Sequence, residues 1–311
     1  MSRKPITEKQ TTAKPTIAIV GAGSLATFLA VALRDAGFTI AEIIARDSPR
    51  SRGRAHSLAS KVGAQAVTAH SAALDATLLW FCVPDREICS AASFLGDRLL
   101  ARAPLVRQRD EVCFALHSSG ALSSRELDSL RAGGVAVASV HPLMTFVAGA
   151  HPSLAGVPFA MEGDAAAKRI ARRIVRELGG EPFALLASRK AAYHAWATLT
   201  SPLLLAFLVT LEEAAGAAGL TRQEARRKSL PIIGQTLENY SRLGPAQSFS
   251  GPLIRGDAET VAKHLAVLKK HPGAREVYMA LSRAALRGLP VKNREELKRL
   301  LASPNAARAG G

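Results

Sequence analysis

Two side chains of the types that transfer protons lie together in a long helical pattern. Lys190 and His194 are four residues apart, so both project from one face of the predicted helix. A lysine shielded in a cleft can donate a proton or polarise a carbonyl group, and a histidine can act as an acid or a base near neutral pH. We predict that both residues are catalytic and that one of them is the proton donor. The alternative is a surface lysine beside a half-buried histidine.

Two further histidines follow apolar runs that predict buried strands. His117 comes after the run 112–116, and His141 comes after the run 136–140. Ligands of open parallel sheets bind outside the carboxyl ends of the strands, so both histidines should lie near the ligand crevice. Each could act as an acid or base, bind a substrate, or hold a loop. We predict that His117, Ser119 and His141 bind substrate.

Arg255 lies in the glycine-bracketed segment 250–257. Its guanidinium group could orient a carboxylate or a phosphate, and we predict that it binds substrate. A structural loop, with Asp257 as the N-cap of the next helix, is an equal alternative.

A glycine turn begins the set of elements that must position these groups. The apolar run 17–20 precedes the turn 21–26, and a helical pattern and a second apolar run, 40–45, follow. This order of strand, glycine turn, helix and strand is typical of dinucleotide-binding sites. Gly21 permits the tight turn, and Gly23 lets the backbone approach a pyrophosphate at the helix N-terminus. The residues predicted to hold the pyrophosphate are Gly21, Gly23, Ser24 and Leu25. The alternative is a purely structural turn.

The end of the second strand indicates which nucleotide binds. NAD-binding proteins usually place an acidic residue there, whereas NADP-binding proteins place an arginine near the 2′-phosphate. Arg46 follows the strand directly, so we predict that NADP(H) is the cofactor and that Arg46 and Ser48 hold its 2′-phosphate. In an alternative register, Asp47 would bind the ribose of NAD.

A strongly apolar run, 78–83, predicts another buried strand, closed by Pro84. Because its carboxyl end should lie beside the cofactor, Val83 and Pro84 are predicted to contact the nicotinamide. A simple turn, with Asp85 capping the following helix, is compatible with this role.

The composition is that of an ordinary globular protein with room for two domains. The chain has 311 residues, of which 48% are hydrophobic, and a formal net charge of +16. Its basic residues are dispersed and only 5% of its residues are aromatic, so we expect no specific nucleic-acid binding. The charge should instead attract an anionic cofactor and a small anionic substrate.

Cysteine spacing and the N-terminal segment bear on the cellular setting. The three cysteines have no metal-ligand spacing and are too few for a disulfide scaffold, so we expect no metal site. The N-terminal segment is polar and basic, with no apolar core, and does not resemble a secretory signal. We therefore expect a cytoplasmic protein.

Strand patterns stop near residue 185, and helical patterns follow. We predict a Rossmann-type doubly wound α/β sheet followed by an all-α C-terminal domain. The predicted divisions are a disordered leader (1–14), a dinucleotide-binding domain (15–185), a helical substrate and dimerisation domain (186–301) and a flexible tail (302–311).

One helical stretch, 195–211, carries no charged residue and is close to the minimum length of a membrane helix. It contains several hydroxyl side chains and Pro202, and no second span accompanies it, so we expect no membrane insertion. A helix buried in a domain core or a dimer interface, kinked near Pro202, is the favoured interpretation.

Five motifs together resemble a bacterial oxidoreductase family that joins a Rossmann-like domain to a C-terminal helical domain of unknown function. They are Gly-Ala-Gly-Ser (21–24), His-Ser-Ser-Gly-Ala-Leu (117–122), His-Pro-Leu-Met-Thr-Phe (141–146), Tyr-His (193–194) and Gly-Pro-Leu-Ile-Arg-Gly-Asp (251–257). The layout is more distantly similar to ketopantoate reductase, pyrroline-5-carboxylate reductase and the 3-hydroxyacid dehydrogenases.

The resemblance implies an NADP-linked reductase with its active site between the domains. Lys190 falls where the hydroxyacid-type relatives place a catalytic lysine, and His194 replaces their usual asparagine. The segment 200–202 is similar to a substrate-contacting stretch of pyrroline-carboxylate reductases, which implies that Ser201 binds substrate. Together with the uncharged helix, the resemblance also implies a homodimer.

We therefore expect an NADPH-dependent reductase of a small 2-oxo acid such as ketopantoate. One alternative is reduction of an imine of the pyrroline-carboxylate type. Another is a redox-sensing module that binds NADP without turnover.

Overall fold

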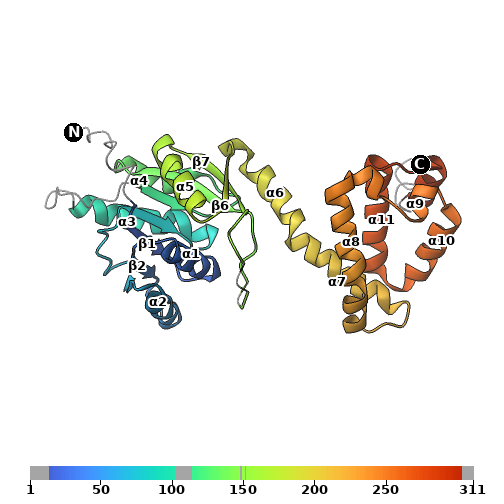
Figure 1. Ribbon diagram of the computed structural model, residues 1–311, viewed down its shortest axis with the longest axis horizontal. Coiled ribbons are helices and arrows are strands. Elements are labelled where there is room, and N and C mark those ends of the chain that lie inside the picture. Colours follow the sequence, from blue (N-terminus) through green and yellow to red (C-terminus); the bar gives the residue numbers. More distant parts are fainter. Residues whose placement is uncertain (1–13, 103–113, 148, 151, 303–311) are drawn as a thin grey trace, which may run out of the picture. The chain divides into compact units, whose positions relative to one another are not determined.

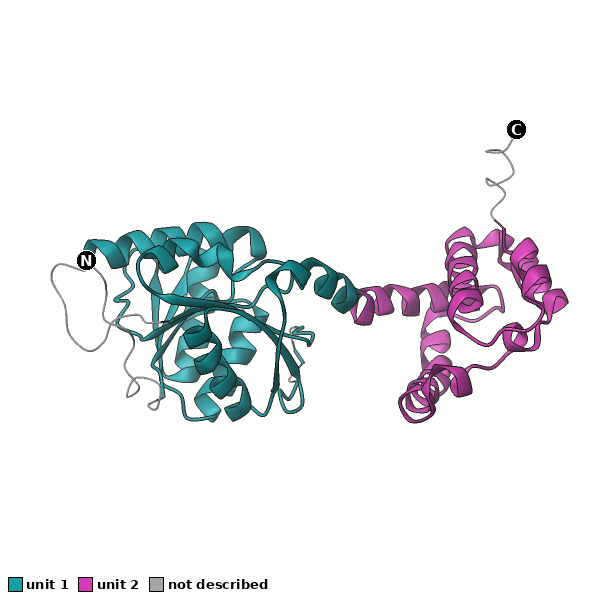
Figure 2. Cartoon of the chain, turned by 90° about the horizontal axis from the view of Figure 1, so that it is seen from above, with its two compact units in different colours: residues 1–198 teal, residues 199–311 magenta. Residues whose placement is uncertain are grey.

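The computed structural model describes residues 14–102, 114–147, 149–150 and 152–302, and the chain divides into two compact units (Figure 2). Unit 1 comprises residues 1–198 and unit 2 comprises residues 199–311. The predicted leader, apart from Lys14, and the predicted tail, apart from Ala302, lie outside the described residues.

Unit 1 is built on an eight-stranded sheet with the order β3-β2-β1-β4-β5-β6-β7-β8 (Figure 1). All neighbouring strands are parallel except β6 and β7, which are antiparallel. The strands are β1 (Ile17–Val20), β2 (Ile40–Ala45), β3 (Gln65–Thr68), β4 (Leu78–Phe81), β5 (Phe114–His117), β6 (Ala136–Pro142), β7 (Pro158–Gly163) and β8 (Glu181–Ala184).

Helices cover both faces of this sheet, which confirms the predicted doubly wound fold. One hydrophobic core lies under α1 (Ser24–Asp35), α2 (Pro49–Val62) and α5 (Ala165–Glu177). The other lies under α3 (Asp85–Arg102) and the short pair η2 (Ser124–Leu127) and α4 (Asp128–Ala132). Strands β1 and β4 are buried along their whole length, which explains why they are continuous apolar runs in the sequence.

The strand order reverses between β1 and β4, and this point creates the ligand crevice of an open α/β sheet. Gly21 follows β1 there with a φ of +115°, a conformation that favours glycine. A Cβ atom at this position would lie 2.5 Å from the carbonyl oxygen of Cys82, just beyond β4. Glycine at position 21 therefore lets the two chain segments meet at the floor of the crevice.

Helix α6 (Lys190–Thr200) begins after the single turn η3 (Ala187–Arg189). The two units divide between Thr198 and Leu199, so most of α6 belongs with the sheet, whereas the prediction assigned it to the helical domain. Hydrogen bonds from Lys190 and Tyr193 to residues at the strand ends account for this difference. The predicted kink near Pro202 is confirmed, because Ser201 has non-helical backbone angles.

Every regular element in the described part of unit 2 is a helix, as predicted. These are α7 (Pro202–Gly216), α8 (Arg222–Ser248), α9 (Pro252–Arg255), α10 (Ala258–Val267), the turn η4 (Leu268–Lys270), α11 (Pro272–Gly288) and α12 (Arg294–Leu300). Their shared core is small and is formed mainly by residues of α10, α11 and α12, among them Val261, Met279 and Leu297.

Large apolar side chains lie exposed along α6, α7 and α8. They are Trp196, Leu199, Leu203, Leu204, Leu205, Val209, Leu230, Ile232, Leu237, Tyr240 and Leu243. The expectation that the stretch 195–211 is buried in a domain core is therefore wrong for the single chain, and the alternative of a dimer interface stays a prediction. By length and composition, Ala187–Gly216, which contains an 18-residue window with a mean hydropathy of 1.5, is the one run in the described residues that could cross a membrane.

Gly163, at the end of the antiparallel strand β7, offers a test of the sheet geometry. It has a φ of +126°, and a Cβ atom there would lie 2.5 Å from the carbonyl oxygen of Val137. We expect Gly163→Ala to destabilise unit 1 by at least about 2 kcal/mol through strain and overpacking. The midpoint of urea unfolding measures this change, and tryptophan fluorescence reports on unit 1 because Trp80 and Trp196 both belong to it.

Gly53 provides the matched control, because it lies in the interior of α2 with no heavy atom within 4 Å of its added Cβ. Gly53→Ala should stabilise unit 1 by about 0.5–1 kcal/mol. Equal midpoints for the two variants would contradict the described β6–β7 pairing.

Candidate active site

A groove of about 510 Å³ lies at the carboxyl edge of the sheet, where the strand order reverses. It is lined by the glycine turn, the ends of β2 and β4, the first turns of α3 and two residues of α2. The predicted cofactor residues that line it are Gly21, Gly23, Arg46, Val83 and Pro84. The groove thus brings together residues from three separate predicted motifs.

The three other predicted cofactor residues lie next to this groove and do not line it. Ser24 lines a neighbouring cavity, Leu25 packs in a small apolar space with Trp80, and Ser48 is the N-cap of α2. The hydroxyl oxygen of Ser48 accepts a hydrogen bond from the backbone N–H of Ser51. Ser48 therefore has a clear structural role, and binding of a phosphate by Ser48 stays a prediction.

The N-terminus of α1 faces the groove with open backbone donors. Gly23 is the N-cap of this twelve-residue helix, no side chain caps it, and its first turn contains no acidic residue. A Cβ atom on Gly23 would meet no heavy atom within 4 Å, so the backbone is open to an approaching group. Free N–H groups and the positive end of the helix dipole suit an anion at this place.

The arginines near the end of β2 differ in their partners. Arg46 forms an ion pair of 2.9 Å with Glu87 at the start of α3, while Arg52 pairs with Asp47 at 2.8 Å. Asp47, the residue that would bind the ribose of NAD, is therefore already paired with a cation. Arg54 of α2 also lines the groove and forms no ion pair within the described residues.

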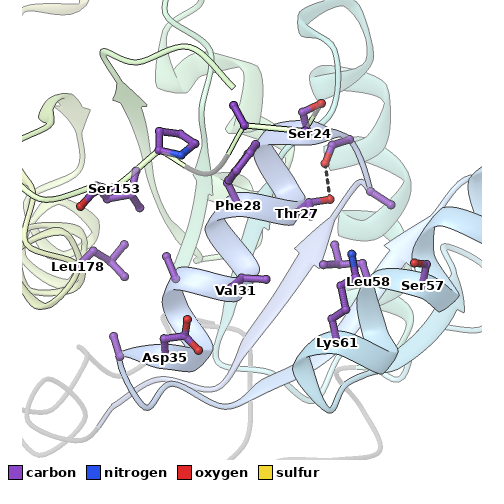
Figure 3. Close-up of a pocket in the computed structure, with 18 of the residues that line it drawn as sticks. Ser24, Thr27, Phe28, Val31, Asp35, Ser57, Leu58, Lys61, Ser153 and Leu178 are labelled. Carbon is purple, nitrogen blue, oxygen red and sulfur yellow. Dashed lines mark hydrogen bonds between the residues drawn. The ribbon is translucent and has the colours of Figure 1, made fainter. Parts of the chain in front are cut away.

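A second cavity of about 840 Å³ runs along the outer face of α1 (Figure 3). Phe28 and Val31 contribute to its apolar floor, and Lys61 of α2 stands on one side. Ala22, Gly23 and Arg54 line both cavities, so the glycine turn lies between them.

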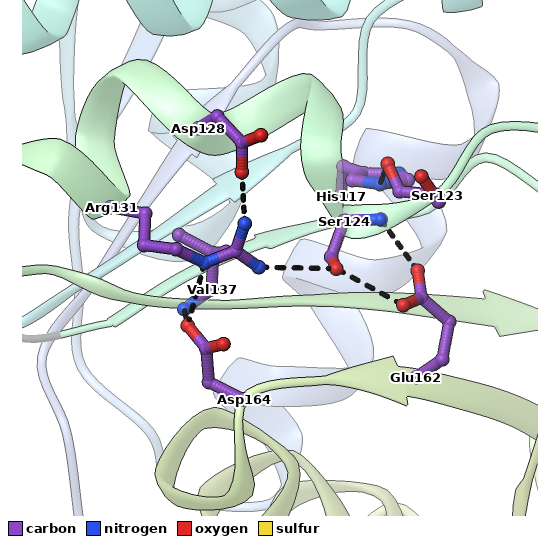
Figure 4. A network of polar contacts seen from close by, with 8 residues as sticks. All are labelled: His117, Ser123, Ser124, Asp128, Arg131, Val137, Glu162 and Asp164. Atoms are coloured by element: carbon purple, nitrogen blue, oxygen red, sulfur yellow. Dashed lines mark hydrogen bonds and ion pairs between the residues drawn. The ribbon is translucent and has the colours of Figure 1, made fainter. Parts of the chain in front are cut away.

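His117, at the end of β5, is completely buried, and both of its ring nitrogens bind backbone groups. Its Nδ1 accepts the backbone N–H of Ser119, so its Nε2–H donates to the carbonyl oxygen of Ser123 at 3.0 Å (Figure 4). Burial and, to a smaller extent, the charge of Lys190 lower the pKa of His117 to about 4. In this geometry, neutral His117 holds the loop that follows β5.

The side chain of Ser119 is equally occupied. Its hydroxyl donates to a carboxylate oxygen of Asp85 at 2.8 Å and accepts the backbone N–H groups of Ala121 and Leu122. Ser119 thereby connects the loop after β5 to the start of α3.

Two buried or half-buried carboxylates complete the support of this loop (Figure 4). Glu162 of β7 accepts hydrogen bonds from the backbone and the hydroxyl of Ser124. Asp164 accepts the backbone N–H of Val137 at 2.9 Å and pairs with Arg131, whose guanidinium also contacts Asp128. The loop after β5 is therefore fixed to both β6 and β7.

Lys190 is buried, with only 2% of its surface exposed, so the alternative of a surface lysine is wrong. Its ammonium group donates hydrogen bonds of 2.6 Å to the carbonyl oxygen of Ser119 and to the hydroxyl of Ser139. Burial lowers the pKa of Lys190 to about 8, although the negative charges of Glu162 and Asp85 act in the opposite direction. Lys190 thus joins the loop after β5 to β6 and remains mostly charged at neutral pH.

His141, at the end of β6, lies against the first turns of α6. Its Nδ1 is 2.8 Å from the hydroxyl oxygen of Tyr193, and its ring centroid is 6.4 Å from that of His194, which is exposed. Burial, followed by the charges of Lys190 and His194, lowers the pKa of His141 to about 4. His141, Lys190 and His194 are therefore neighbours.

Two predicted substrate residues belong to unit 2, and each is described within that unit. Ser201 is the N-cap of α7, and Arg255 is the last residue of α9. Asp257 caps α10, as predicted, by accepting the backbone N–H of Thr260. The substrate-binding roles of Ser201 and Arg255 stay predictions.

Several residues of this site were not identified from the sequence. Tyr193 and Ser139 bind His141 and Lys190, and Glu87 and Arg54 face the groove beside Arg46. Of these, Tyr193 carried a signal because it directly precedes His194, and Arg54 carried one because it belongs to the run of arginines that begins at Arg46. In the described part of the chain, no group of three or more His, Cys, Asp or Glu side chains could hold a metal ion.

Comparisons with solved structures find similar folds over nearly the whole chain. A Bacteroides fragilis protein described as an NADP oxidoreductase is 24% identical, with a TM-score of 0.69 over 87% of this chain and 97% of its own. A Myxococcus stipitatus imine reductase in complex with NADP⁺ is 16% identical, with a TM-score of 0.62 over 93% and 100%. A Coxiella burnetii pyrroline-5-carboxylate reductase is 15% identical, with a TM-score of 0.56 over 94% and 100%. At these identities, the similarity establishes the shared fold.

Comparisons of the sequence give the domain families. No curated protein matches the chain. Two family models match: a Rossmann-like domain over residues 1–142 and a domain of unknown function, DUF2520, over residues 157–285. The chain therefore joins a Rossmann-like domain to a DUF2520 domain, which is the combination that its motifs resemble.

Proposed function

We propose that this protein is an NADP(H)-dependent oxidoreductase that reduces a small 2-oxo acid of the ketopantoate type. One observation carries the proposal: an open glycine-turn groove and a buried lysine–histidine cluster share the carboxyl edge of one sheet, within one compact unit. The names of the similar solved structures, which include NADP oxidoreductases, support the same reaction class.

The groove fits a dinucleotide. The backbone at Gly21 and Gly23 and the first amides of α1 would hold the pyrophosphate, and Arg46 and Arg54 would lie near the 2′-phosphate. Val83 and Pro84 would contact the nicotinamide, which supplies the hydride when the cofactor is bound. Because Arg46 is paired with Glu87, a phosphate would take the place of that carboxylate.

The cluster on α6 divides the proton chemistry between two residues. The ammonium of Lys190 is enclosed and already donates two hydrogen bonds, whereas the imidazole of His194 is exposed. We therefore assign proton delivery to His194. Lys190 would hold the strand ends and supply the positive charge that attracts an anionic substrate, while His141 orients the carboxylate.

Imine reduction is the second candidate, because the similar solved structures include imine reductases and pyrroline-carboxylate reductases. A protein that binds NADP(H) and reduces neither oxo acids nor imines would be the redox-sensing module instead. The cytoplasmic location stays a prediction.

A homodimer is proposed on the exposed apolar surface of unit 2. Leu205 on α7 and Ile232 on α8 are 63% and 68% exposed, and an apolar cavity of about 570 Å³ lies between α7 and α11. Apolar patches of this kind mark association surfaces, and the family resemblance points to a second copy of the chain.

The first test concerns the cofactor. Arg46→Ala should weaken NADPH binding by about tenfold, or roughly 1.4 kcal/mol, and leave NADH binding unchanged, because only NADPH carries the 2′-phosphate. Fluorescence titration with each nucleotide measures both affinities. Arg52→Ala is the matched control, since Arg52 is paired with Asp47 and lines no described cavity. Failure of the unaltered protein to bind either nucleotide would reject the proposed function.

The second test concerns catalysis. His194→Gln should lower kcat for 2-oxo acids by about 10²–10⁴-fold, because glutamine cannot deliver a proton. Since Lys190 is charged below its pKa of about 8, the KM for an anionic substrate should be lowest below pH 8 and rise as the pH passes through 8. Steady-state kinetics of ketopantoate and pyruvate reduction between pH 6 and pH 10 measure both effects.

Lys190→Met separates the role of the charge from that of the buried volume. It should raise the KM for the oxo acid and abolish its rise above pH 8, and NADPH binding serves as the check on folding. If Lys190→Met and His194→Gln both stayed within a few-fold of the unaltered activity, the assignment of this cluster would be wrong.

The third test concerns assembly. Sedimentation or light scattering should give twice the 32.8 kDa chain mass, and Leu205→Asp combined with Ile232→Asp should reduce it to the monomer. Leu100→Asp on α3 is the control, because Leu100 is similarly exposed on unit 1 and should not matter. A monomer at all concentrations, or a protein that stays in solution only with detergent, would contradict the homodimer.

A further inference from the structure

We infer that His141 is a neutral imidazole whose Nε2–H donates a hydrogen bond to a substrate oxygen, and that the phenol of Tyr193 selects this tautomer. The tautomer follows from the contacts within unit 1 alone. The identity of the acceptor as a substrate oxygen rests on the proposed function.

The hydroxyl group of Tyr193 pairs with Nδ1 of His141. The phenol oxygen lies 2.8 Å from Nδ1 of His141, and the two rings meet edge to face with centroids 5.5 Å apart. Tyr193 is buried, and its ring also packs against Phe183 and Trp196. This packing on both sides holds the phenol in its place beside the imidazole.

The chemistry of the two groups determines the direction of this hydrogen bond. The phenol O–H is a good donor, but its oxygen is a weak acceptor because its lone pair is shared with the ring, whereas an unprotonated imidazole nitrogen is a strong acceptor. The O–H of Tyr193 therefore donates to Nδ1, and the single proton of a neutral His141 must lie on Nε2.

Burial and the surrounding charges keep the pair in this state. Burial raises the pKa of Tyr193 to about 12, and burial together with the charges of Lys190 and His194 lowers the pKa of His141 to about 4. Neither ring changes its charge near neutral pH. The imidazole thus resembles a fixed N–H donor and not a titrating acid.

The Nε2 side of the His141 ring is open. Nε2 has no hydrogen-bond partner among the described residues. A fully buried polar atom without a partner would be a rarity, and Nε2 is not such an atom, so solvent reaches it. A Cβ atom at Gly120 would lie 2.9 Å from Nε2 and 2.7 Å from a ring carbon of His194. Only glycine at position 120 leaves both imidazoles in these positions. The outcome is an accessible N–H donor with no protein acceptor.

The chemistry of the donor indicates the class of ligand. A neutral N–H beside the ammonium of Lys190 favours an acceptor with lone pairs and negative charge, such as a keto oxygen or a carboxylate. A protonated imine has no lone pair on nitrogen and is repelled by Lys190. The arrangement therefore favours a keto oxygen or a carboxylate over an iminium nitrogen at this place. A keto oxygen is particular to a 2-oxo acid, whereas a carboxylate is shared with imines of the pyrroline-carboxylate type.

The test measures the tautomer directly. In protein labelled with ¹⁵N-histidine, two-bond proton–nitrogen correlation spectra at pH 7 distinguish the two neutral tautomers and the cation. The chain has eight histidines, and the signals of His141 are those lost in His141→Gln. We expect the Nε2–H tautomer in the unaltered protein and a mixture of both tautomers in Tyr193→Phe. An Nδ1–H tautomer or a cation in the unaltered protein would overturn the inference, even if Tyr193→Phe failed to fold.

Unit 2 contains a matched control. Tyr278 and His264 form the same kind of pair, with the phenol oxygen 3.0 Å from Nδ1 and ring centroids 5.8 Å apart. Tyr193→Phe should lower kcat/KM for ketopantoate or pyruvate by about tenfold with NADPH affinity unchanged, whereas Tyr278→Phe should leave both unchanged. Equal effects of the two substitutions would show that the loss is a general one and not specific to His141.

The tautomer and the proposed function can fail separately. An Nε2–H tautomer in a protein that reduces no oxo acid would uphold the pairing and reject the function. Reduction of oxo acids by a protein with His141 in the Nδ1–H form would uphold the function and reject the inference.

Discussion

The buried ammonium group of Lys190 is the interaction on which the site depends. A charge taken out of water is costly unless it is paired and hydrogen-bonded, and here it binds Ser119, just beyond β5, and Ser139 within the neighbouring strand β6. Glu162 and Asp85 provide the opposite charge nearby. Since these bonds hold the start of α6 at the sheet, the same bonds that satisfy the lysine also set the positions of the histidines beside it.

The fold was largely predictable because its signals are local. Buried parallel strands must be continuous apolar runs, so the runs at 17–20 and 78–83 identify the central strands, and a φ near +115° after β1 explains Gly21. The boundary between the two units was harder to predict from the sequence. The pattern of α6 is purely helical, and its attachment to the sheet results from hydrogen bonds to residues about 50 positions earlier.

The site was predictable in part for the same physical reason. Helical spacing put Lys190 and His194 on one face, and strand ends indicated His141, but the partners that fix their protonation come from distant parts of the chain. His117 illustrates the limit, because a strand-end histidine and a loop-holding histidine have the same sequence pattern. Apolar composition likewise indicates that a surface avoids water but not what covers it, which is why the sequence left the stretch 195–211 between a domain core and a dimer interface.

The ion pair between Arg46 and Glu87 has a consequence for selectivity. A phosphate that reaches Arg46 replaces Glu87 as the anionic partner of this arginine. The net free energy of phosphate binding is therefore the difference between two ion pairs and not the full strength of one. A nucleotide with a hydroxyl group in place of the 2′-phosphate, such as NADH, cannot make this exchange and leaves the carboxylate where it is. Glu87 therefore competes for Arg46 with every anion that enters the groove.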